Sequence, residues 1–384
     1  MHDLVFDTEP LVQAISKGVP MDDGRCRVFT LPFESRHAGF LRPEDRDIEE
    51  NRRFTYVMVE PAASTPRAYA DILLIFHGLN EGSYAKLVPW AYNLACLAEM
   101  PVLIFPMAFH INRRSNAWGF SNQLRLYNLR RRTPDIHKVS PFNATISERF
   151  AQAPDRLFRG GLQTYYDVLT LCDHIRSGSH PGCRPGARPH CLGYSAGGYL
   201  ALVLMLADPG GRFGDSRCIL FASGADLDGV HPASIFILDA HADHRMIEFF
   251  RTRQYEQVAF DPAVAALTSE PERWLTEVFF HGPRLAARIE ALQTRLRAIA
   301  NIGDEVITAE GMVRNLDRLD VRHFALGIHE LPFTLPGPLP DTYDRHDKAT
   351  KAAISGAHNS SRIGESYREA FGRFIDEVAG FLRT

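Results

Sequence analysis

The sequence predicts an α/β fold in which a mostly parallel central sheet lies between two layers of helices. Short apolar runs that end at Gly, Pro or polar turns alternate along the chain with segments of helical period, which is typical of a parallel sheet. Hydrophobic residues make up 45% of the composition and charged residues 23%, as in an ordinary globular protein. At 384 residues, the chain is long enough for one large α/β core and an inserted segment.

The predicted strands are apolar runs that are bounded by turn residues. In chain order they cover 54–59, 71–76, 101–107, 190–194, 218–222, 295–301 and 321–328, with 27–31 as a candidate ahead of them. Helices are predicted where apolar residues recur at helical spacing. They cover 90–97, 161–175, 198–207 and 362–382, and the last of these carries a single apolar stripe.

Two regions interrupt this alternation and divide the chain into expected domains. Residues 109–160 are polar and Arg-rich and are expected to be loop-like. Residues 225–290 look helical although they lie between two strands, and they are expected to form a helical cap over the carboxyl ends of the strands, where open α/β sheets bind ligands. The core is then 54–224 together with 291–384. The N-terminal extension, 1–53, either covers an edge of the sheet or mediates a homodimer.

The charge balance and the apolar runs exclude several classes of protein. A net charge of −3 and a pI near 6.6 argue against nucleic acid as the main partner, because phosphate binding requires clustered positive charge. No apolar run has the length of a membrane-spanning helix, and residues 1–20 lack the apolar segment of a signal peptide. The six cysteines form no CxxC pair, so we expect free, buried thiols. These observations predict a cytoplasmic protein without stable membrane insertion.

The run Gly193-Tyr194-Ser195-Ala196-Gly197 marks Ser195 as a candidate nucleophile. A predicted strand ends at the second residue of this run, and an apolar helix follows it. The small residues around the serine allow the strand and the helix to approach each other at a sharp turn. A serine hydroxyl is a poor nucleophile unless a base removes its proton, and that base needs a carboxylate to orient it.

This serine, followed along the chain by an acid and then a histidine behind later strands, resembles the α/β-hydrolase superfamily over residues 54–384. Asp304 follows the strand 295–301 and matches the acid of that family, and His329 matches its base. Asp226 remains an alternative acid, because it also follows a predicted strand. The alternative bases are His323, His346 and His358.

The resemblance also implies an oxyanion hole, which is a pair of N–H donors aimed at the charge that develops during acyl transfer. These donors would be the backbone N–H groups of Ala196, directly after the nucleophile, and of Leu79, in the loop after the strand 71–76. Three residues beside these donors and the nucleophile are candidate substrate-binding residues. They are His77, Asn80 and Tyr194.

The activity that the resemblance implies is hydrolysis of a carboxylic ester or thioester, with no metal or organic cofactor. Aromatic residues of the expected cap favour a small-molecule substrate with a hydrophobic part. They are Phe249, Phe250, Trp274, Phe279 and Phe280. An acyltransferase that uses the same triad and a non-catalytic ligand-binding module on this fold remain alternatives.

Two further patterns have a structural and a functional interpretation each. The run 239–244 is similar to a metallo-β-lactamase motif with Asp239 in place of the first His, but a helix would splay these side chains apart, so a polar cap face is favoured over a metal site. The arginines of 113–132 are expected to pair with acidic groups in a solvated loop. The alternative is that Arg130, Arg131 and Arg132 bind an anionic part of the substrate.

Overall fold

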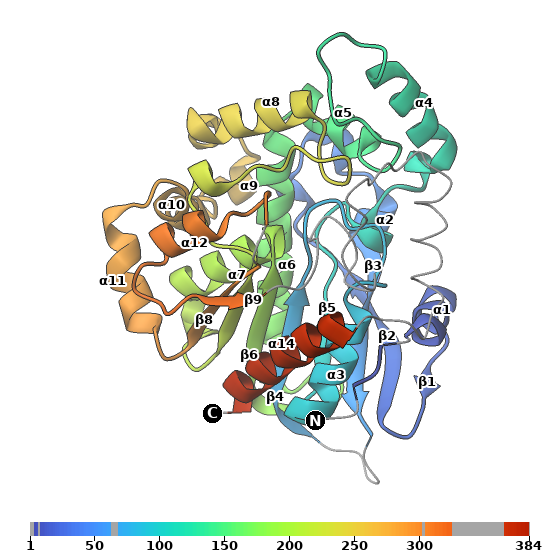
Figure 1. Cartoon of the computed structure of the whole chain (residues 1–384), viewed down its shortest axis with the longest axis vertical. Helices are drawn as coiled ribbons and strands as arrows, with labels where there is room; N and C mark the ends of the chain where they lie inside the picture. The colour runs from blue at the N-terminus through green and yellow to red at the C-terminus, as the bar shows by residue number, and fades with distance from the viewer. Residues whose placement is uncertain (1–3, 7, 63–67, 302–303, 325–364, 384) are drawn as a thin grey trace.

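The computed structural model describes residues 4–6, 8–62, 68–301, 304–324 and 365–383, with 365–369 described by their backbone alone. In this part of the chain nine strands form one sheet, in the order β1-β2-β3-β5-β4-β6-β7-β8-β9 (Figure 1). The pairs β1–β2, β2–β3 and β3–β5 are antiparallel, and every pair from β5 to β9 is parallel. The predicted fold class, a mostly parallel α/β sheet, is therefore confirmed.

The strands follow the predicted apolar runs closely. Their bounds are β1 Met21–Asp22, β2 Cys26–Glu34, β3 Arg53–Pro61, β4 Tyr69–Phe76, β5 Val102–Ile104, β6 Cys183–Tyr194, β7 Cys218–Phe221, β8 Leu296–Asn301 and β9 Arg322–Phe324. The run predicted at 101–107 contains only the three residues of β5. The end of the run predicted at 321–328 lies outside the described residues.

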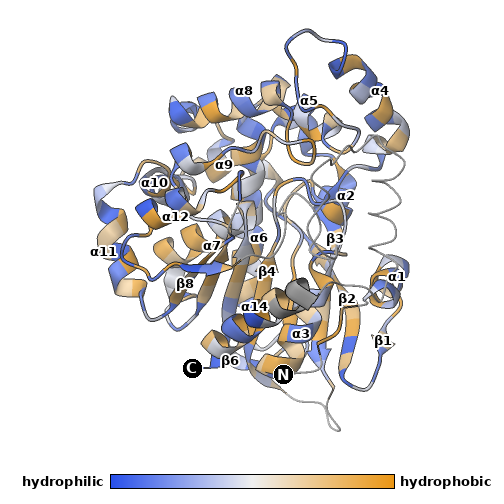
Figure 2. Cartoon of the chain, in the orientation of Figure 1, coloured by the Kyte–Doolittle hydropathy of each residue, from blue (hydrophilic) through white to orange (hydrophobic). Residues whose placement is uncertain are grey.

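Helices pack on both faces of the sheet (Figure 1). On one face lie α6 (Asp155–Ser177), α7 (Ala196–Ala207), α10 (Ser269–Phe279), α11 (Pro283–Leu292) and α12 (Ala309–Asn315). On the other face lie α1 (Glu9–Lys17), α3 (Val88–Ala98) and α14 (Glu365–Arg383). Because each central strand is covered on both sides, its sequence is continuously apolar, and Figure 2 shows the central strands in orange.

Successive residues of strand β4 pack alternately against the helices on the two faces of the sheet. Ile72, Leu74 and Phe76 are buried among the side chains of α6 and α7, whereas Leu73 and Ile75 are buried with α3 and α14. This two-residue alternation is the geometry of a strand, in which neighbouring side chains point to opposite faces. The carboxyl end of β4 is thereby held between two cores, which gives the loop after it a rigid base.

The N-terminal extension forms one edge of the sheet. Strands β1 and β2 continue the sheet beyond β3, and the candidate strand at 27–31 lies inside β2. The short helix α2 (Glu49–Arg52) leads directly into β3. Within 1–53 the structure thus places two strands at the edge of the sheet, and a role in a homodimer stays a prediction. The six cysteines are free thiols, five of them buried.

The expectation that 109–160 is loop-like is wrong. The segment contains α4 (Phe120–Arg130), α5 (Ala144–Gln152) and the first turns of α6. Helix α4 buries only Leu126 and Arg130, so the hydrophobic period that identifies most helices is weak there. Helix α5 buries the polar side chains of Thr145 and Ser147 beside Ala144 and Phe150.

The expected cap, 225–290, separates into two parts in the structure. Helix α8 (Ala240–Arg251) packs against α5 and lies at the same end of the molecule as α4 (Figure 1), and the short helix α9 (Pro262–Ala265) follows it in the chain. By contrast, α10 and α11 bury Trp274, Val278 and Leu285 in the core beside α7. The layer over the carboxyl ends of the strands is therefore built from both 109–160 and the first part of 225–290. As a boundary of one domain, 225–290 stays a prediction.

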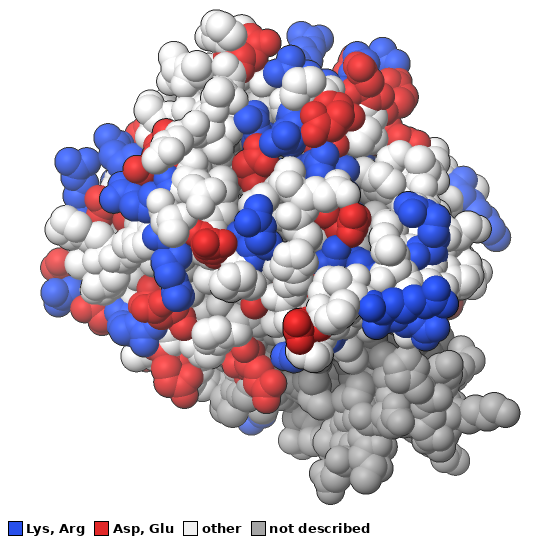
Figure 3. Space-filling view, turned by 90° about the horizontal axis from the view of Figure 1, so that it is seen from above, with Lys and Arg blue, Asp and Glu red and all other residues white. Residues whose placement is uncertain are grey.

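The surface at this end of the molecule carries charges of both signs. Figure 3 shows basic and acidic side chains interspersed there rather than gathered into separate patches. Within the described ranges, each helix falls short of the length or the apolar character that crossing a lipid bilayer requires.

Candidate active site

Ser195 lies at a sharp turn between the end of β6 and the start of α7. Its backbone has φ 52° and ψ −120°, a combination that is rare for a residue with a side chain. Such strain costs about 1–3 kcal/mol and persists only where the surrounding structure holds it. The backbone N–H of Ser195 donates to the carbonyl of Phe221 on β7, at 3.0 Å, which ties the turn to the sheet.

The glycines around this serine are required by close packing. A Cβ atom on Gly193 would lie 2.4 Å from Cα of Gly198, and one on Gly197 would lie 2.5 Å from the backbone of Phe76. A Cβ atom on Gly198 would lie 2.3 Å from Cβ of Ser223. Distances of this kind do not occur between real atoms, so the strand and the helix meet at the turn only because these positions lack side chains.

The loop after β4 lies directly beside the serine. A Cβ atom on Gly78 would be 3.4 Å from Cβ of Ser195 and 2.9 Å from the ring of Tyr194. Leu79 follows at once, and Ala196 is the first residue of α7, so its N–H has no acceptor within the helix. The two residues expected to supply the oxyanion donors thus flank the serine in space.

Asn80 connects this loop to the layer above. Its backbone is left-handed, with φ 63°, a conformation that asparagine tolerates better than most residues. Its side-chain amide donates to the carbonyl oxygens of Phe142 and Phe236, at 3.1 and 2.6 Å. The amide therefore anchors the loop to two segments of the upper layer, while the residue itself lines the cavity described below.

His77 and Tyr194 lie beneath the site instead of in the lining of its cavity. Both ring nitrogens of His77 are used, because Nδ1 donates to the carbonyl of Gly78 at 2.8 Å and Nε2 accepts from the N–H of Met107 at 2.9 Å. Burial holds the pKa of His77 well below its usual value, so the ring is neutral. The Tyr194 ring packs between Trp90 and Phe221. Neither residue is part of the cavity lining, and a direct contact of either with the substrate stays a prediction.

Asp304 lies after β8 and is buried, with 7% of its surface exposed. Its Oδ1 accepts from the N–H groups of Val306 and Ile307, at 2.8 and 2.7 Å, and its own N–H donates to the carbonyl of Asn301. These bonds fix the carboxylate at the carboxyl end of β8. That strand pairs with β7, and β7 pairs with β6, the strand that ends at the Ser195 turn.

The alternative acid, Asp226, has both carboxylate oxygens engaged elsewhere. It receives two hydrogen bonds from Arg314, and its Oδ1 caps the short helical turn Leu227–Gly229 by accepting from the N–H of Gly229. This arrangement disfavours Asp226 as the acid, and the choice between Asp226 and Asp304 stays a prediction. His329, the expected base, lies outside the described residues, as do His346 and His358. His323 lies within β9 and is exposed.

A cavity of about 190 Å³ opens between the serine turn and the upper layer. Leu79, Asn80 and Ala196 line it from below, α6, α7 and α10 line its sides, and α5 covers it. Of the five cap aromatics expected at the substrate, Phe250 and Phe279 line it. Its larger aliphatic and phenylalanine side chains are Leu79, Met107, Phe109, Ile146, Phe150, Leu157, Phe158, Leu162, Leu200, Val203, Phe250, Leu275 and Phe279. Such a lining suits a substrate with a hydrophobic part.

Polar residues besides Asn80 line this cavity, and among them only Arg114, as one of the arginines of 113–132, was a candidate from the sequence. His110, Arg114, Thr145 and Arg149 contribute to its lining. Thr145 and Arg149 are four residues apart on α5 and so share one face of the helix. The sequence signal for this pair was its four-residue spacing. That spacing places the two side chains on one face only if the segment is a helix, and this segment was expected to be a loop.

Two of the arginines of 113–132 pair with carboxylates. Arg113 is fully buried and forms an ion pair with Asp167, at 2.9 Å. The guanidinium of Arg130 is bound by Glu148 and by Asp239, which also caps the N-terminus of α8. The expected pairing with acidic groups is therefore present at Arg113 and Arg130, although Arg113 is buried and not in a solvated loop. Anion binding by Arg130, the alternative, is disfavoured because carboxylates already occupy its guanidinium. The role of Asp239 as a cap and ion-pair partner explains the run 239–244 without a metal.

Comparison with known proteins gives a family match and several distant structural similarities. Residues 31–354 match the model of DUF6051, a family of unknown function. No curated protein matches the chain.

Three of the solved structures similar to this chain are esterases. Carboxyl esterase 2 of the mycorrhizal fungus Tuber melanosporum is 12% identical, with a TM-score of 0.48 over 94% of this chain and 88% of that one. Brefeldin A esterase, a bacterial homologue of human hormone sensitive lipase, is 13% identical, with a TM-score of 0.46 over 98% and 81%. EstE1, a thermostable carboxylesterase cloned from a metagenomic library, is 12% identical, with a TM-score of 0.46 over 98% and 94%.

Proposed function

This chain belongs to DUF6051, a family of unknown function, and we propose that it is a serine hydrolase that cleaves a carboxylic ester or thioester with a hydrophobic part. The observation that carries the proposal is the strained turn at Ser195, which lies beside Gly78 and directly before Ala196, a residue that lines an apolar cavity together with Leu79. Backbone strain of this kind is concentrated at functional sites. A serine nucleophile on a strand-to-helix turn is a common example.

In the proposed reaction, Oγ of Ser195 forms a bond to the carbonyl carbon of the substrate while His329 takes the hydroxyl proton. Asp304 orients the imidazole of His329. The backbone N–H groups of Leu79 and Ala196 hold the oxyanion. When the bond to the alcohol or thiol breaks, His329 returns the proton to the leaving group. Water, deprotonated by the same histidine, then releases the acid and restores Ser195.

Covalent labelling tests the proposal most directly. A fluorophosphonate probe is expected to form a phosphorus–oxygen bond with Oγ of Ser195 and release fluoride, so that mass spectrometry finds the adduct on the peptide that contains this residue. The same protein is expected to release acid from some members of a panel of p-nitrophenyl esters and acyl thioesters, without an added alcohol acceptor. A chain that takes no label and cleaves nothing in the panel is not a serine hydrolase.

The acid assignment is tested by a matched pair of variants. Asp304→Asn is expected to lower kcat/KM by about 10³–10⁴-fold, because an amide no longer holds the imidazole in the required tautomer. Asp226→Asn is expected to change kcat/KM only a few-fold, since that carboxylate is bound by Arg314 and Gly229. Measured kcat/KM values in the opposite order would assign the acid to Asp226.

A further inference from the structure

The cavity has an apolar lining, yet it contains buried polar atoms without a partner. Seven buried side-chain N or O atoms of the described residues lack a hydrogen bond, and three of them belong to the lining of this cavity. They are Nε2 of His110, Oγ1 of Thr145 and Nη2 of Arg149. An unsatisfied buried group costs about 1–3 kcal/mol, so three in one cavity call for an explanation.

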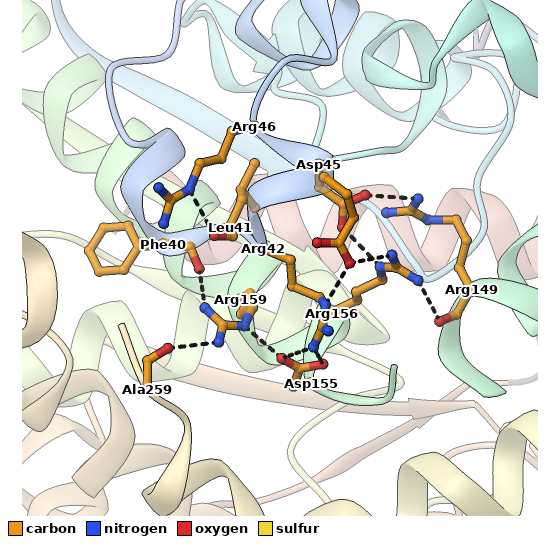
Figure 4. A network of polar contacts seen from close by, with 11 residues as sticks. Phe40, Leu41, Arg42, Asp45, Arg46, Arg149, Asp155, Arg156, Arg159 and Ala259 are labelled. Atoms are coloured by element: carbon orange, nitrogen blue, oxygen red, sulfur yellow. Dashed lines mark hydrogen bonds and ion pairs between the residues drawn. The ribbon is translucent and has the colours of Figure 1, made fainter. Parts of the chain in front are cut away.

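Arg149 is held in place by contacts on its other side. Its Nη1 donates to Asp45 at 3.1 Å, and its guanidinium lies 4.2 Å from the ring centre of Trp118 and 4.9 Å from that of Phe109. Asp45 is itself bound by Arg156, at 2.9 Å (Figure 4). The Nη2 group is therefore a fixed donor, and little side-chain entropy is lost when a ligand binds to it.

The network behind Arg149 has more positive than negative charge. Four arginines share three carboxylates in one chain of ion pairs, part of which is drawn in Figure 4. The arginines are Arg42, Arg149, Arg156 and Arg159, and the carboxylates are Glu44, Asp45 and Asp155. An anionic ligand would balance the one excess positive charge of this network.

Arg114 provides a second guanidinium in the lining. It is partly buried, and among the described residues no carboxylate lies within ion-pair distance of it and no hydrogen bond satisfies it. Burial lowers the pKa of Arg114 from its ordinary value, which reflects the cost of holding this charge away from water. A buried cation without a counter-ion is stabilised when an anion binds beside it.

His110 and Thr145 complete the cluster. His110 is 6% exposed and Thr145 is 3% exposed. Nδ1 of His110 donates to the carbonyl of Ala108 at 2.8 Å, so Nε2 of the neutral ring is an acceptor. Burial and nearby arginines, Arg114 among them, lower the pKa of His110 to about 4, which keeps the ring neutral. The Thr145 hydroxyl donates or accepts as its partner requires.

We infer that the part of the substrate that fills this cavity carries a carboxylate, which Arg149 and Arg114 bind, while the rest of that part packs on the apolar lining. This inference rests on the proposed function, because it names the substrate class of the same site. A carboxylate is favoured over a compact anion because its planar pair of oxygens matches the donor geometry of a guanidinium.

Matched esters test the inference. One pair places the carboxylate in the acyl part, as the p-nitrophenyl hemiester of suberic acid against its neutral methyl diester. A second pair places it in the alcohol part, as the butyrate ester of 8-hydroxyoctanoic acid against that of its methyl ester. The wild-type chain is expected to prefer the anionic member of at least one pair by about tenfold in kcat/KM, the effect of one good charge-assisted hydrogen bond.

Variants assign the preference to the two arginines. Arg114→Met, which breaks no hydrogen bond or ion pair among the described residues, is expected to raise KM for the preferred anionic ester about tenfold and to leave the neutral ester unchanged. Arg149→Lys is expected to act in the same direction while it retains a charge beside Asp45. Arg131→Met is the matched control, because Arg131 stacks on Tyr127 and is not part of the lining.

The outcomes separate this inference from the proposed function. If neutral and anionic esters are cleaved equally well, or if Arg114→Met affects both alike, the carboxylate site is excluded while the hydrolase proposal stands. If no ester is cleaved, calorimetric titration with suberate alone still reports on the site. Binding that Arg114→Met weakens supports the site without the activity, and no binding excludes it.

Discussion

Ser195→Ala is expected to reduce kcat/KM for any accepted ester by about 10⁴-fold or more, with KM nearly unchanged. The reason is that the variant loses only the atom that forms the acyl-enzyme, while the cavity and the backbone N–H donors remain. Activity that persists is expected to come from those donors and from binding alone. Initial-rate measurements with a p-nitrophenyl ester, together with the mass of the protein during turnover, test this result.

A neighbouring serine offers the matched control. Ser223 is fully buried at the end of β7, and its Oγ lacks a partner among the described residues. Ser223→Ala removes a hydroxyl of the same kind from the surroundings of the turn without touching the nucleophile, so kcat/KM is expected to stay within a few-fold. If both variants lose activity equally, the effect is structural and the role of Ser195 is refuted. If neither does, the chemistry takes place elsewhere.

The serine turn was predictable because every feature that forms it is local. The apolar run before Ser195, the glycines on either side and the apolar helix after it are adjacent in the sequence. Gly193 and Gly197 must be glycine because a Cβ atom at either position would clash with neighbouring backbone atoms. Both glycines are part of the five-residue motif around Ser195. The central strands were predictable for a similar reason, since a strand that is buried on both faces must be apolar along its whole length.

The upper layer was not predictable in the same way. Its helices α4 and α5 are held by ion pairs between distant residues, such as Arg130 with Asp239, which are 109 positions apart. Such pairs leave no period in the sequence. The choice between Asp304 and Asp226 was open for a related reason, because both follow adjacent parallel strands and only the hydrogen bonds of each carboxylate distinguish them.

The second large effect is expected at Arg113, whose charge is buried below the cavity. Arg113→Met is expected to lower the free energy of unfolding by about 3–5 kcal/mol, because it leaves the carboxylate of Asp167 buried without its cation. Both side chains of this pair are fully buried. Arg113 also donates to the side chain of Asn51 and to the carbonyl of Pro106, at 3.0 and 3.1 Å. Urea unfolding followed by tryptophan fluorescence measures the loss.

A double variant shows whether charge burial is the cause. Arg113→Met combined with Asp167→Leu removes both charges, so it is expected to be more stable than Arg113→Met alone, although a single domain of ordinary stability has only about 5–15 kcal/mol to lose. If the two losses simply add, the pair is not coupled and the explanation fails.

The double variant also bears on the cavity, because Arg113 lies between His110 and Arg114 in the chain. A double variant that folds but no longer prefers anionic esters would show that the buried pair positions those two residues for the substrate.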